Sequence, residues 1–244
     1  MSFKKDFPIF TNNPNLIFFD STSTTQKPSY VIDWIKKYLE HDYSNIHRGM
    51  YDIAINSEKL YKKSKEIVAK FLWVSDPREI IYTYNSTYAS NLLTSSLRRS
   101  NYLRAWDKVL LSIVEHHANV VPWLILKEEI WIIVDFIKVD DEYNLDFDEK
   151  YDESVKVISL THVSNVTGQV FDLAEIGRRK REDTLFVVDA SQIVPHMKVN
   201  VKKINCDALF FTGHKVMADS WIGVLWWKKE LLNELTPSFS WGWA

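Results

Sequence analysis

The sequence has little cysteine and glycine, and it has no long apolar run. Cys206 is the only cysteine among 244 residues, which excludes an intrachain disulfide framework. No signal-peptide pattern and no run of about 18 apolar residues occurs, so we expect a soluble cytoplasmic protein without a membrane contact. The formal net charge of −2 lacks the basic excess that nucleic-acid binding requires. These absences leave an intracellular globular protein as the expected class.

Glycine and tryptophan occur in unusual proportions. The chain contains 6 glycines, where average usage of about 7% would give roughly 17. It contains 10 tryptophans, although tryptophan is the bulkiest side chain. Glycine normally supplies the positive φ angles of tight turns, so a chain with many loops should not lack it. The two counts therefore call for a common explanation.

Continuous apolar runs alternate with helical patterns along most of the chain. Lys27–Ser29 opens a helix that runs to about residue 40, and Ser57 is a plausible N-cap for a helix ending at Leu72. Further helical segments are expected at 87–98, 117–128 and 173–181. Strands are expected at 79–83, 108–113, 131–137, 155–160, 185–190, 208–212 and 222–227. This pattern predicts an α/β fold with a mostly parallel sheet and helices on both faces.

Two further features of the organisation follow from the same pattern. The connection from 208–212 to 222–227 is too short for a parallel crossover, so we expect the last strand to be antiparallel. We expect residues 1–27 to form an irregular N-terminal segment and residues 28–244 to form one large domain.

Lys215 lies between the last two expected strands, where an ammonium group is costly to bury unless it is paired or neutralised. Covalent capture of a carbonyl as a Schiff base would resolve this conflict, and a desolvated lysine is suited to such chemistry. Asp189 ends the apolar run at 185–190, about 25 residues before Lys215, although a lone aspartate at a strand end is more often a helix N-cap. An acidic partner for a ring nitrogen and a reactive lysine together suggest pyridoxal 5'-phosphate (PLP).

Polar side chains follow three other expected strands. Ser86 and Thr87 open a helix, where hydroxyl and N–H groups suit a phosphate, although an ordinary N-cap is the simpler interpretation. His116 could stack on a ring or move a proton, or it could be a surface or core histidine; a metal site is disfavoured because no further cluster has ligand spacing. Asn165 could bond a ring hydroxyl or a substrate carboxylate, or form a turn. Each group alone has an ordinary explanation, but chance is a poor explanation for suitable polar groups at all of these strand ends together.

Several long motifs give the sequence a specific resemblance. These are residues 116–123 (HHANVVPW), 162–166 (HVSNV), 189–196 (DASQIVPH) and 213–215 (GHK), with further matches at 20–28 and 45–49. They resemble the group II (SufS-like) cysteine desulfurases, within the class V aminotransferase family of fold-type I PLP enzymes. The resemblance implies the large PLP domain of that fold type, with a seven-stranded, mostly parallel sheet and one antiparallel strand.

The resemblance also implies roles for individual residues. Lys215 would form the Schiff base, His116 would stack on the PLP ring and assist proton transfer, and Asp189 would pair with the ring nitrogen. Gln192 and Asn165 would contact the region of the ring hydroxyl. The phosphate would be bound by Ser86, Thr87, Thr212 and His214. Asn165 and Arg48 would contact the substrate. The implied substrate is L-cysteine, or selenocysteine, and the implied partners are a sulfur-acceptor protein of iron–sulfur cluster assembly and a second copy of the chain. No metal is implied.

The sequence departs from the family pattern in its thiol and in its phosphate loop. The family's nucleophilic cysteine, which becomes a persulfide, lies in a C-terminal part that this sequence does not include, and Cys206 is expected to be buried and structural. We therefore expect this chain alone not to complete desulfuration. Asn85 replaces a phosphate-loop glycine, and we expect it to tolerate a left-handed backbone. Alternatives are a selenocysteine lyase, a kynureninase-like enzyme, an aminotransferase or a degenerate non-catalytic fragment.

Seven tryptophans stand where the family typically has glycine. They are Trp73, Trp106, Trp131, Trp221, Trp227, Trp241 and Trp243. Our hypothesis is that the gene uses UGA for glycine, as some bacterial lineages do, and that the sequence was translated with UGA as tryptophan. Trp123 matches a family tryptophan and should be encoded by UGG in either case. The hypothesis explains both unusual counts.

Overall fold

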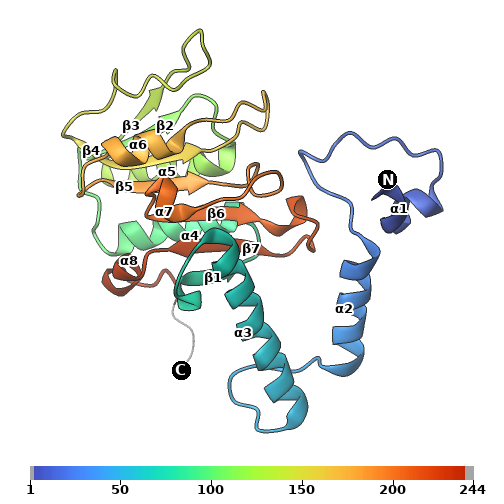
Figure 1. Ribbon diagram of the computed structural model, residues 1–244. Helices are drawn as coiled ribbons and strands as arrows, with labels where there is room; N and C mark the ends of the chain where they lie inside the picture. Colours follow the sequence, from blue (N-terminus) through green and yellow to red (C-terminus); the bar gives the residue numbers. More distant parts are fainter. Residues whose placement is uncertain (1–2, 240–244) are drawn as a thin grey trace.

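The computed structural model describes residues 3–239 and is built on one seven-stranded sheet (Figure 1). The strand order is β1-β7-β6-β5-β4-β2-β3. The strands are β1 (Ile80–Thr83), β2 (Lys108–Ser112), β3 (Ile133–Ile137), β4 (Val155–Thr161), β5 (Leu185–Asp189), β6 (Ala208–Thr212) and β7 (Gly223–Trp227). All seven predicted strands are thereby confirmed, to within two residues at each end.

Strand β7 alone runs against the direction of the other strands in the described sheet. It pairs antiparallel with both β1 and β6, while the remaining neighbours pair in parallel. Gly223, the first residue of β7, is the partner of both Thr83 and Thr212, the last residues of β1 and β6. The register therefore brings the carboxyl ends of the parallel strands and the start of β7 to one edge of the sheet.

Each face of the sheet buries its own hydrophobic cluster. Leu110 packs on one face with Leu72 and Ile176, from α3 (Asp52–Leu72) and α6 (Leu173–Arg179). Val109 packs on the opposite face with Leu93 and neighbouring residues, from α4 (Ser86–Arg99) and α5 (Val121–Ile130). Successive strand residues point to opposite faces, so the continuous apolar runs follow from coverage on both sides. The prediction of helices on both faces is confirmed.

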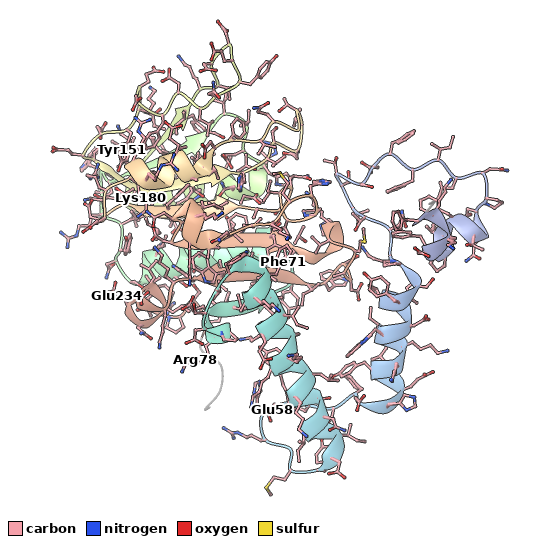
Figure 2. All side chains as sticks on the ribbon, in the orientation of Figure 1. Glu58, Phe71, Arg78, Tyr151, Lys180 and Glu234 are labelled. Carbon is pink, nitrogen blue, oxygen red and sulfur yellow. The ribbon has the colours of Figure 1, made fainter. Side chains whose placement is uncertain are left out.

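The structure also describes four further helices and four 3-10 turns. They are α1 (Pro8–Asn12), α2 (Ser29–His41), α7 (Val201–Ile204) and α8 (Lys229–Glu234), with 3-10 turns η1 (Phe3–Asp6), η2 (Pro77–Glu79), η3 (His117–Asn119) and η4 (Gly213–Lys215). Helix α2 buries no residue and stands away from the sheet in Figure 1. In Figure 2, Phe71 lies on the end of α3 beside the sheet and Glu58 lies further out. Within residues 3–239, no helix has the length and hydropathy needed to cross a membrane.

Two local predictions in the N-terminal part are wrong. Helix α3 begins at Asp52 rather than after Ser57, because its first turn follows the extended Tyr51. Ser57 is instead an interior helical residue that is buried and donates its hydroxyl to the backbone carbonyl of Asp42. Residues 1–27 are not irregular throughout, since η1 and α1 form two short helical turns there. The serine signal was ambiguous because a serine inside a helix can also hydrogen-bond locally.

Three of the seven tryptophans that were expected to stand at glycine positions have left-handed backbones. Their φ angles are 64° at Trp73, 75° at Trp106 and 63° at Trp131. Trp73 and Trp131 occupy the C-terminal cap of α3 and of α5, the position where glycine usually ends a helix. Positive φ is thus found at these three positions, whereas Trp221 and Trp227 have no positive φ. Trp241 and Trp243 lie outside the described residues.

Candidate active site

A pocket of about 780 Å³ lies at the carboxyl edge of the sheet. Its lining includes nine of the ten residues expected from the sequence: Ser86, Thr87, His116, Asn165, Asp189, Gln192, Thr212, His214 and Lys215. These residues follow five different strands and meet because those strands end at the same edge. Arg48 does not line this pocket and lies in the connection between α2 and α3.

Lys215 ends the 3-10 turn η4, immediately after β6. A Cβ atom on Gly213 would come within 2.4 Å of Ile222 Cγ2 and 2.9 Å of the Ile222 carbonyl oxygen, so only glycine lets the chain leave β6 this close to the next strand. Burial lowers the pKa of the Lys215 amine, and the nearby negative charge of Asp189 opposes this effect. The lowered pKa enlarges the fraction of neutral amine, which is the nucleophilic form.

Asp189 is the last residue of β5 and is only 4% exposed. Burial raises the pKa of its carboxyl group, while a hydrogen bond from the Ser191 backbone N–H and the positive charges of Lys215 and His116 oppose the rise. The Ser191 N–H lies 2.9 Å from Asp189 Oδ1 and fixes the orientation of the carboxylate. A buried carboxylate held in this way suits a cationic N–H partner.

His116 follows β2 and starts the turn η3. Its Nδ1 accepts a hydrogen bond of 3.1 Å from the Ala118 backbone N–H, so the ring proton of the neutral form resides on Nε2. This bond also fixes the orientation of the imidazole at the pocket wall. His116 can therefore present a flat ring and one N–H donor to a bound molecule.

Glu115 forms a hydrogen-bond network that sequence reasoning missed. Its carboxylate accepts bonds from the Ser112 hydroxyl (2.5 Å), the Asn119 amide (2.7 Å) and the Thr161 backbone N–H (2.8 Å). Asn119 Oδ1 in turn accepts from the Ser159 hydroxyl. Burial raises the pKa of Glu115 to about 7, although the three donors favour its ionised form. The network ties the His116 turn to the end of β4.

The first turn of α4 forms the anion-binding wall of the pocket. Asn85 caps this helix by accepting a hydrogen bond from the Tyr88 backbone N–H, so neither Ser86 nor Thr87 is the N-cap. The N–H groups of Ser86 and Thr87 precede the intrahelical ladder and favour an anion. Asn85 does not need a left-handed backbone at this position, because its φ of −170° is ordinary extended backbone.

Gly223 explains how the α4 turn can pack so closely on the sheet. A Cβ atom at this position would come within 2.6 Å of both the Asn85 carbonyl carbon and Thr83 Oγ1. Beside this contact, the Thr212 hydroxyl is buried and lacks a hydrogen-bond partner within residues 3–239. A buried hydroxyl without a partner is costly, and a bound phosphate oxygen would satisfy it.

Asn165 lies in the loop after β4, where an ordinary turn was the alternative interpretation. The turn is instead held by Ser164, whose hydroxyl oxygen accepts hydrogen bonds of 3.2 Å from the backbone N–H groups of Val166 and Thr167. Asn165 lines the pocket and its side chain is not what forms the turn.

The N-terminal segment supplies part of the pocket wall, which the expected division at residue 27 did not foresee. Asp20, Thr22 and Ser23 line the pocket, and the amide nitrogen of Gln192 donates a hydrogen bond of 3.0 Å to the Thr22 carbonyl oxygen. The 20–28 match was the sequence signal that could have found this wall. The contact between Gln192 and Thr22 joins residues 170 positions apart, so local patterns cannot reveal it.

Cys206 is fully buried just before β6, and burial raises the pKa of its thiol far above the ordinary value. This agrees with the structural role expected from the sequence, because a thiolate is the reactive form. Within the described residues, no group of three or more histidine, cysteine or carboxylate side chains could hold a metal ion.

The donor set of the pocket fits PLP. It combines a lysine amine of lowered pKa, a buried carboxylate in the same pocket and a helix N-terminus beside a hydroxyl that lacks a partner within the described residues. These groups match an aldehyde, a pyridinium nitrogen and a phosphate. The fold and pocket thus define a PLP-binding domain of the type with an open, mostly parallel sheet.

Comparison with known proteins places the chain in a family. Residues 17–242 match the aminotransferase class-V family, so the chain belongs to this family of PLP-dependent enzymes. A probable cysteine desulfurase from Synechocystis sp. is 34% identical over 246 residues, covering 98% of this chain and 58% of the relative. A cysteine desulfurase from Synechococcus elongatus is 36% identical over 96% of this chain and 38% of the relative.

Solved structures agree with this placement. The apo cysteine desulfurase from Thermococcus onnurineus NA1 is similar with a TM-score of 0.91 and 34% identity, covering 98% of this chain and 59% of that protein. The Escherichia coli cysteine desulfurase CsdA, in its S-sulfonic acid form, has a TM-score of 0.88 and 29% identity. The chain thus spans 38–60% of the length of these four relatives.

Proposed function

We propose that this chain is the PLP-binding portion of a cysteine desulfurase. The single observation that carries the proposal is the convergence of Lys215, Asp189, His116 and the α4 N-terminus on one pocket. The names of the relatives support L-cysteine as the substrate. The proposal places residues 28–244 in the cofactor-binding domain, with residues 1–27 contributing one wall.

PLP, when bound, would supply an electron sink that labilises bonds at the α-carbon of an amino acid. The Lys215 amine would hold the cofactor covalently, and Asp189 would accept a hydrogen bond from the ring nitrogen. The lowered pKa of Lys215 enlarges the neutral fraction of its amine, which would be able to accept a proton whenever it is free.

His116 and the phosphate wall would orient the cofactor. The His116 ring is fixed by the Ala118 N–H, so it can cover one face of the pyridine ring and donate from Nε2. Ser86, Thr87, Thr212 and His214 would bind the phosphate. Burial and the charges of Lys215 and Lys27 lower the pKa of His214, which favours its neutral form. The neutral imidazole still has one N–H that could donate to the phosphate.

The remaining contacts of the proposal concern the substrate and the partners. Asn165 and Gln192 would bind near the ring hydroxyl, with Asn165 also near the substrate carboxylate. Arg48 does not line this pocket. It would therefore bind the substrate only if the connection between α2 and α3 moved, or if the Arg48 of a second copy of the chain reached the pocket. A homodimer, a sulfur-acceptor protein of iron–sulfur cluster assembly, a SufS-like subgroup and a cytoplasmic location complete the proposal.

A second candidate function is cofactor binding without sulfur transfer. It is favoured by the burial of Cys206, the only cysteine of the sequence. Under this candidate the chain binds PLP and L-cysteine but releases no sulfide or persulfide.

A spectroscopic titration tests both candidates. PLP added to the purified chain should give a visible absorbance band that is lost in Lys215→Ala and kept in Lys198→Ala, a control at an exposed lysine outside the pocket. L-Cysteine should then change the band, whereas kynurenine should not. A band that responds to kynurenine or to an aminotransferase substrate instead would overturn the desulfurase proposal. Alanine and sulfur release would contradict the second candidate.

A further inference from the structure

The backbone on both sides of Lys215 is held by the N-terminal segment. The Thr25 hydroxyl donates to the His214 carbonyl oxygen (2.9 Å) and accepts from the Met217 backbone N–H (2.8 Å). One side-chain oxygen therefore bridges the residue before Lys215 and the second residue after it. The two sequence positions joined by the first bond are 189 residues apart.

Other donors of the same segment converge on the His214 carbonyl oxygen. The Thr25 backbone N–H lies 2.9 Å from it, the Lys27 ammonium 3.1 Å and the Thr24 hydroxyl 3.3 Å. The Lys27 ammonium also donates to the Thr25 carbonyl oxygen at 2.8 Å. A carbonyl oxygen has two lone pairs, so these donors share it, and the charged one contributes most strongly.

The lysine turn has few constraints of its own. Its internal backbone bonds run from Val216 and Ala218 to the Gly213 carbonyl oxygen, and Met217 has a left-handed φ of 66°. A methionine in this conformation is strained and persists only where its surroundings hold it. The Thr25 hydroxyl is the group that holds the Met217 N–H.

We propose that Thr25 is a positioning residue for Lys215, acting through the backbone of residues 214 and 217. By fixing the turn, its hydroxyl directs the lysine amine toward the bound cofactor, and Lys27 reinforces the same contact. This inference rests on the proposed PLP function and adds to it a residue outside the strand ends.

The proposal predicts a difference between binding the cofactor and bonding to it. Thr25→Val keeps the shape of the side chain but removes its donor and its acceptor. Of the proposed cofactor contacts, only His214 lies on this turn besides Lys215, and the others lie on the first turn of α4 and on the strand ends. Most of the noncovalent binding should therefore survive, while the covalent fraction at saturating PLP should fall. The loss of two neutral hydrogen bonds corresponds to about a tenfold shift toward the noncovalent form.

The experiment measures the ratio of the visible band to the near-ultraviolet band of bound PLP. Thr25→Val should lower this ratio about tenfold, and Thr25→Ser should restore it. Thr24→Val is the matched control, since within residues 3–239 the Thr24 hydroxyl makes only the long 3.3 Å bond and accepts no backbone N–H. Far-ultraviolet circular dichroism and amide exchange at Met217 accompany each variant, so that an unfolded variant is recognised.

The outcomes separate this inference from the proposed function. A wild-type chain that forms no Lys215 adduct refutes the proposed function itself. The positioning role alone is overturned if the wild type forms the adduct but Thr25→Val has the same band ratio as the wild type. It is also overturned if Thr24→Val lowers the ratio as much as Thr25→Val does. If Thr25→Val fails to fold, the test rests on Thr25→Ser, which retains the hydroxyl. A band ratio of Thr25→Ser equal to that of the wild type supports the proposal, and a ratio well below it contradicts the proposal.

Discussion

Replacing the left-handed tryptophans by glycine should stabilise the protein. Trp73 follows α3 and sits in a Schellman-type cap, with its N–H bonded to the Lys70 carbonyl oxygen and the Val74 N–H bonded to the Ala69 carbonyl oxygen. Trp131 ends α5 in the same conformation, and Trp106 precedes β2 with a φ of 75°. The three backbones have the geometry that glycine adopts without a Cβ penalty.

The expected gain follows from two opposing effects. A non-glycine residue in the left-handed region costs about 1–2 kcal/mol. The greater unfolded-state entropy of glycine returns about 0.5–1 kcal/mol of this. The indoles are 58%, 68% and 67% exposed at Trp73, Trp106 and Trp131, so little burial is lost. Each substitution should therefore stabilise by about 0.5–1 kcal/mol, and the triple variant by about 2 kcal/mol.

Denaturant unfolding followed by circular dichroism measures this gain without relying on tryptophan fluorescence. Trp34→Gly is the matched control, because Trp34 is 56% exposed within α2 and has no positive φ. That variant should lose about 1 kcal/mol through helix propensity. The Trp106 backbone N–H donates to the Trp131 carbonyl oxygen, so substitutions at these two sites can influence each other. Their effects on stability should therefore be compared in a double-mutant cycle. If the three cap substitutions destabilise as Trp34→Gly does, the reasoning is refuted.

Three further predictions concern other parts of the structure. The pKa of Glu115 is raised to about 7, so folding favours its protonated form. As the pH rises from about 4.5 to 7, the wild-type free energy of unfolding should fall by up to about 3 kcal/mol more than that of Glu115→Gln. Equal slopes of stability against pH for the two proteins would contradict this. Gly223→Ala should weaken PLP binding at least tenfold, because its Cβ would come within 2.6 Å of the Asn85 backbone and displace the α4 turn; unchanged affinity would refute the close contact. Cys206 should resist iodoacetamide in the folded chain and react in urea, and rapid labelling of the native protein would contradict its burial.

The strands and most of the pocket could be predicted because they depend on local patterns. Continuous apolar runs mark strands covered on both faces, and parallel strands bring their carboxyl ends to one edge. Lys215, Asp189 and His116 were found by their position directly after such runs. The reversal of β7 followed from the length of one connection.

Other features could not be predicted because they depend on contacts distant in sequence. The bridge from Thr25 to Met217 and the wall formed by residues 20–23 exist only when the N-terminal segment packs against the lysine turn. The Glu115 network joins β2 to β4 through side chains with no characteristic spacing. Ser57 was misassigned because a serine before a helical pattern and a serine inside it look alike in sequence.

The tryptophans illustrate a case where the sequence and the structure must be considered together. Composition suggested the hypothesis of UGA read as tryptophan, and the left-handed φ angles of Trp73, Trp106 and Trp131 support it independently. Trp227 is buried in β7, and its Nε1 has no hydrogen-bond partner within the described residues. The codons decide this hypothesis directly: UGG at the seven positions would end it.

Covalent trapping at Lys215 tests the central claim most directly. The chain is incubated with PLP, reduced with borohydride, digested and mapped by mass spectrometry. We predict one major cofactor adduct, on the peptide that contains Lys215, and its loss in Lys215→Ala. A major adduct on another lysine, or none under conditions where the chain is folded, would contradict the assignment of this pocket as a PLP site.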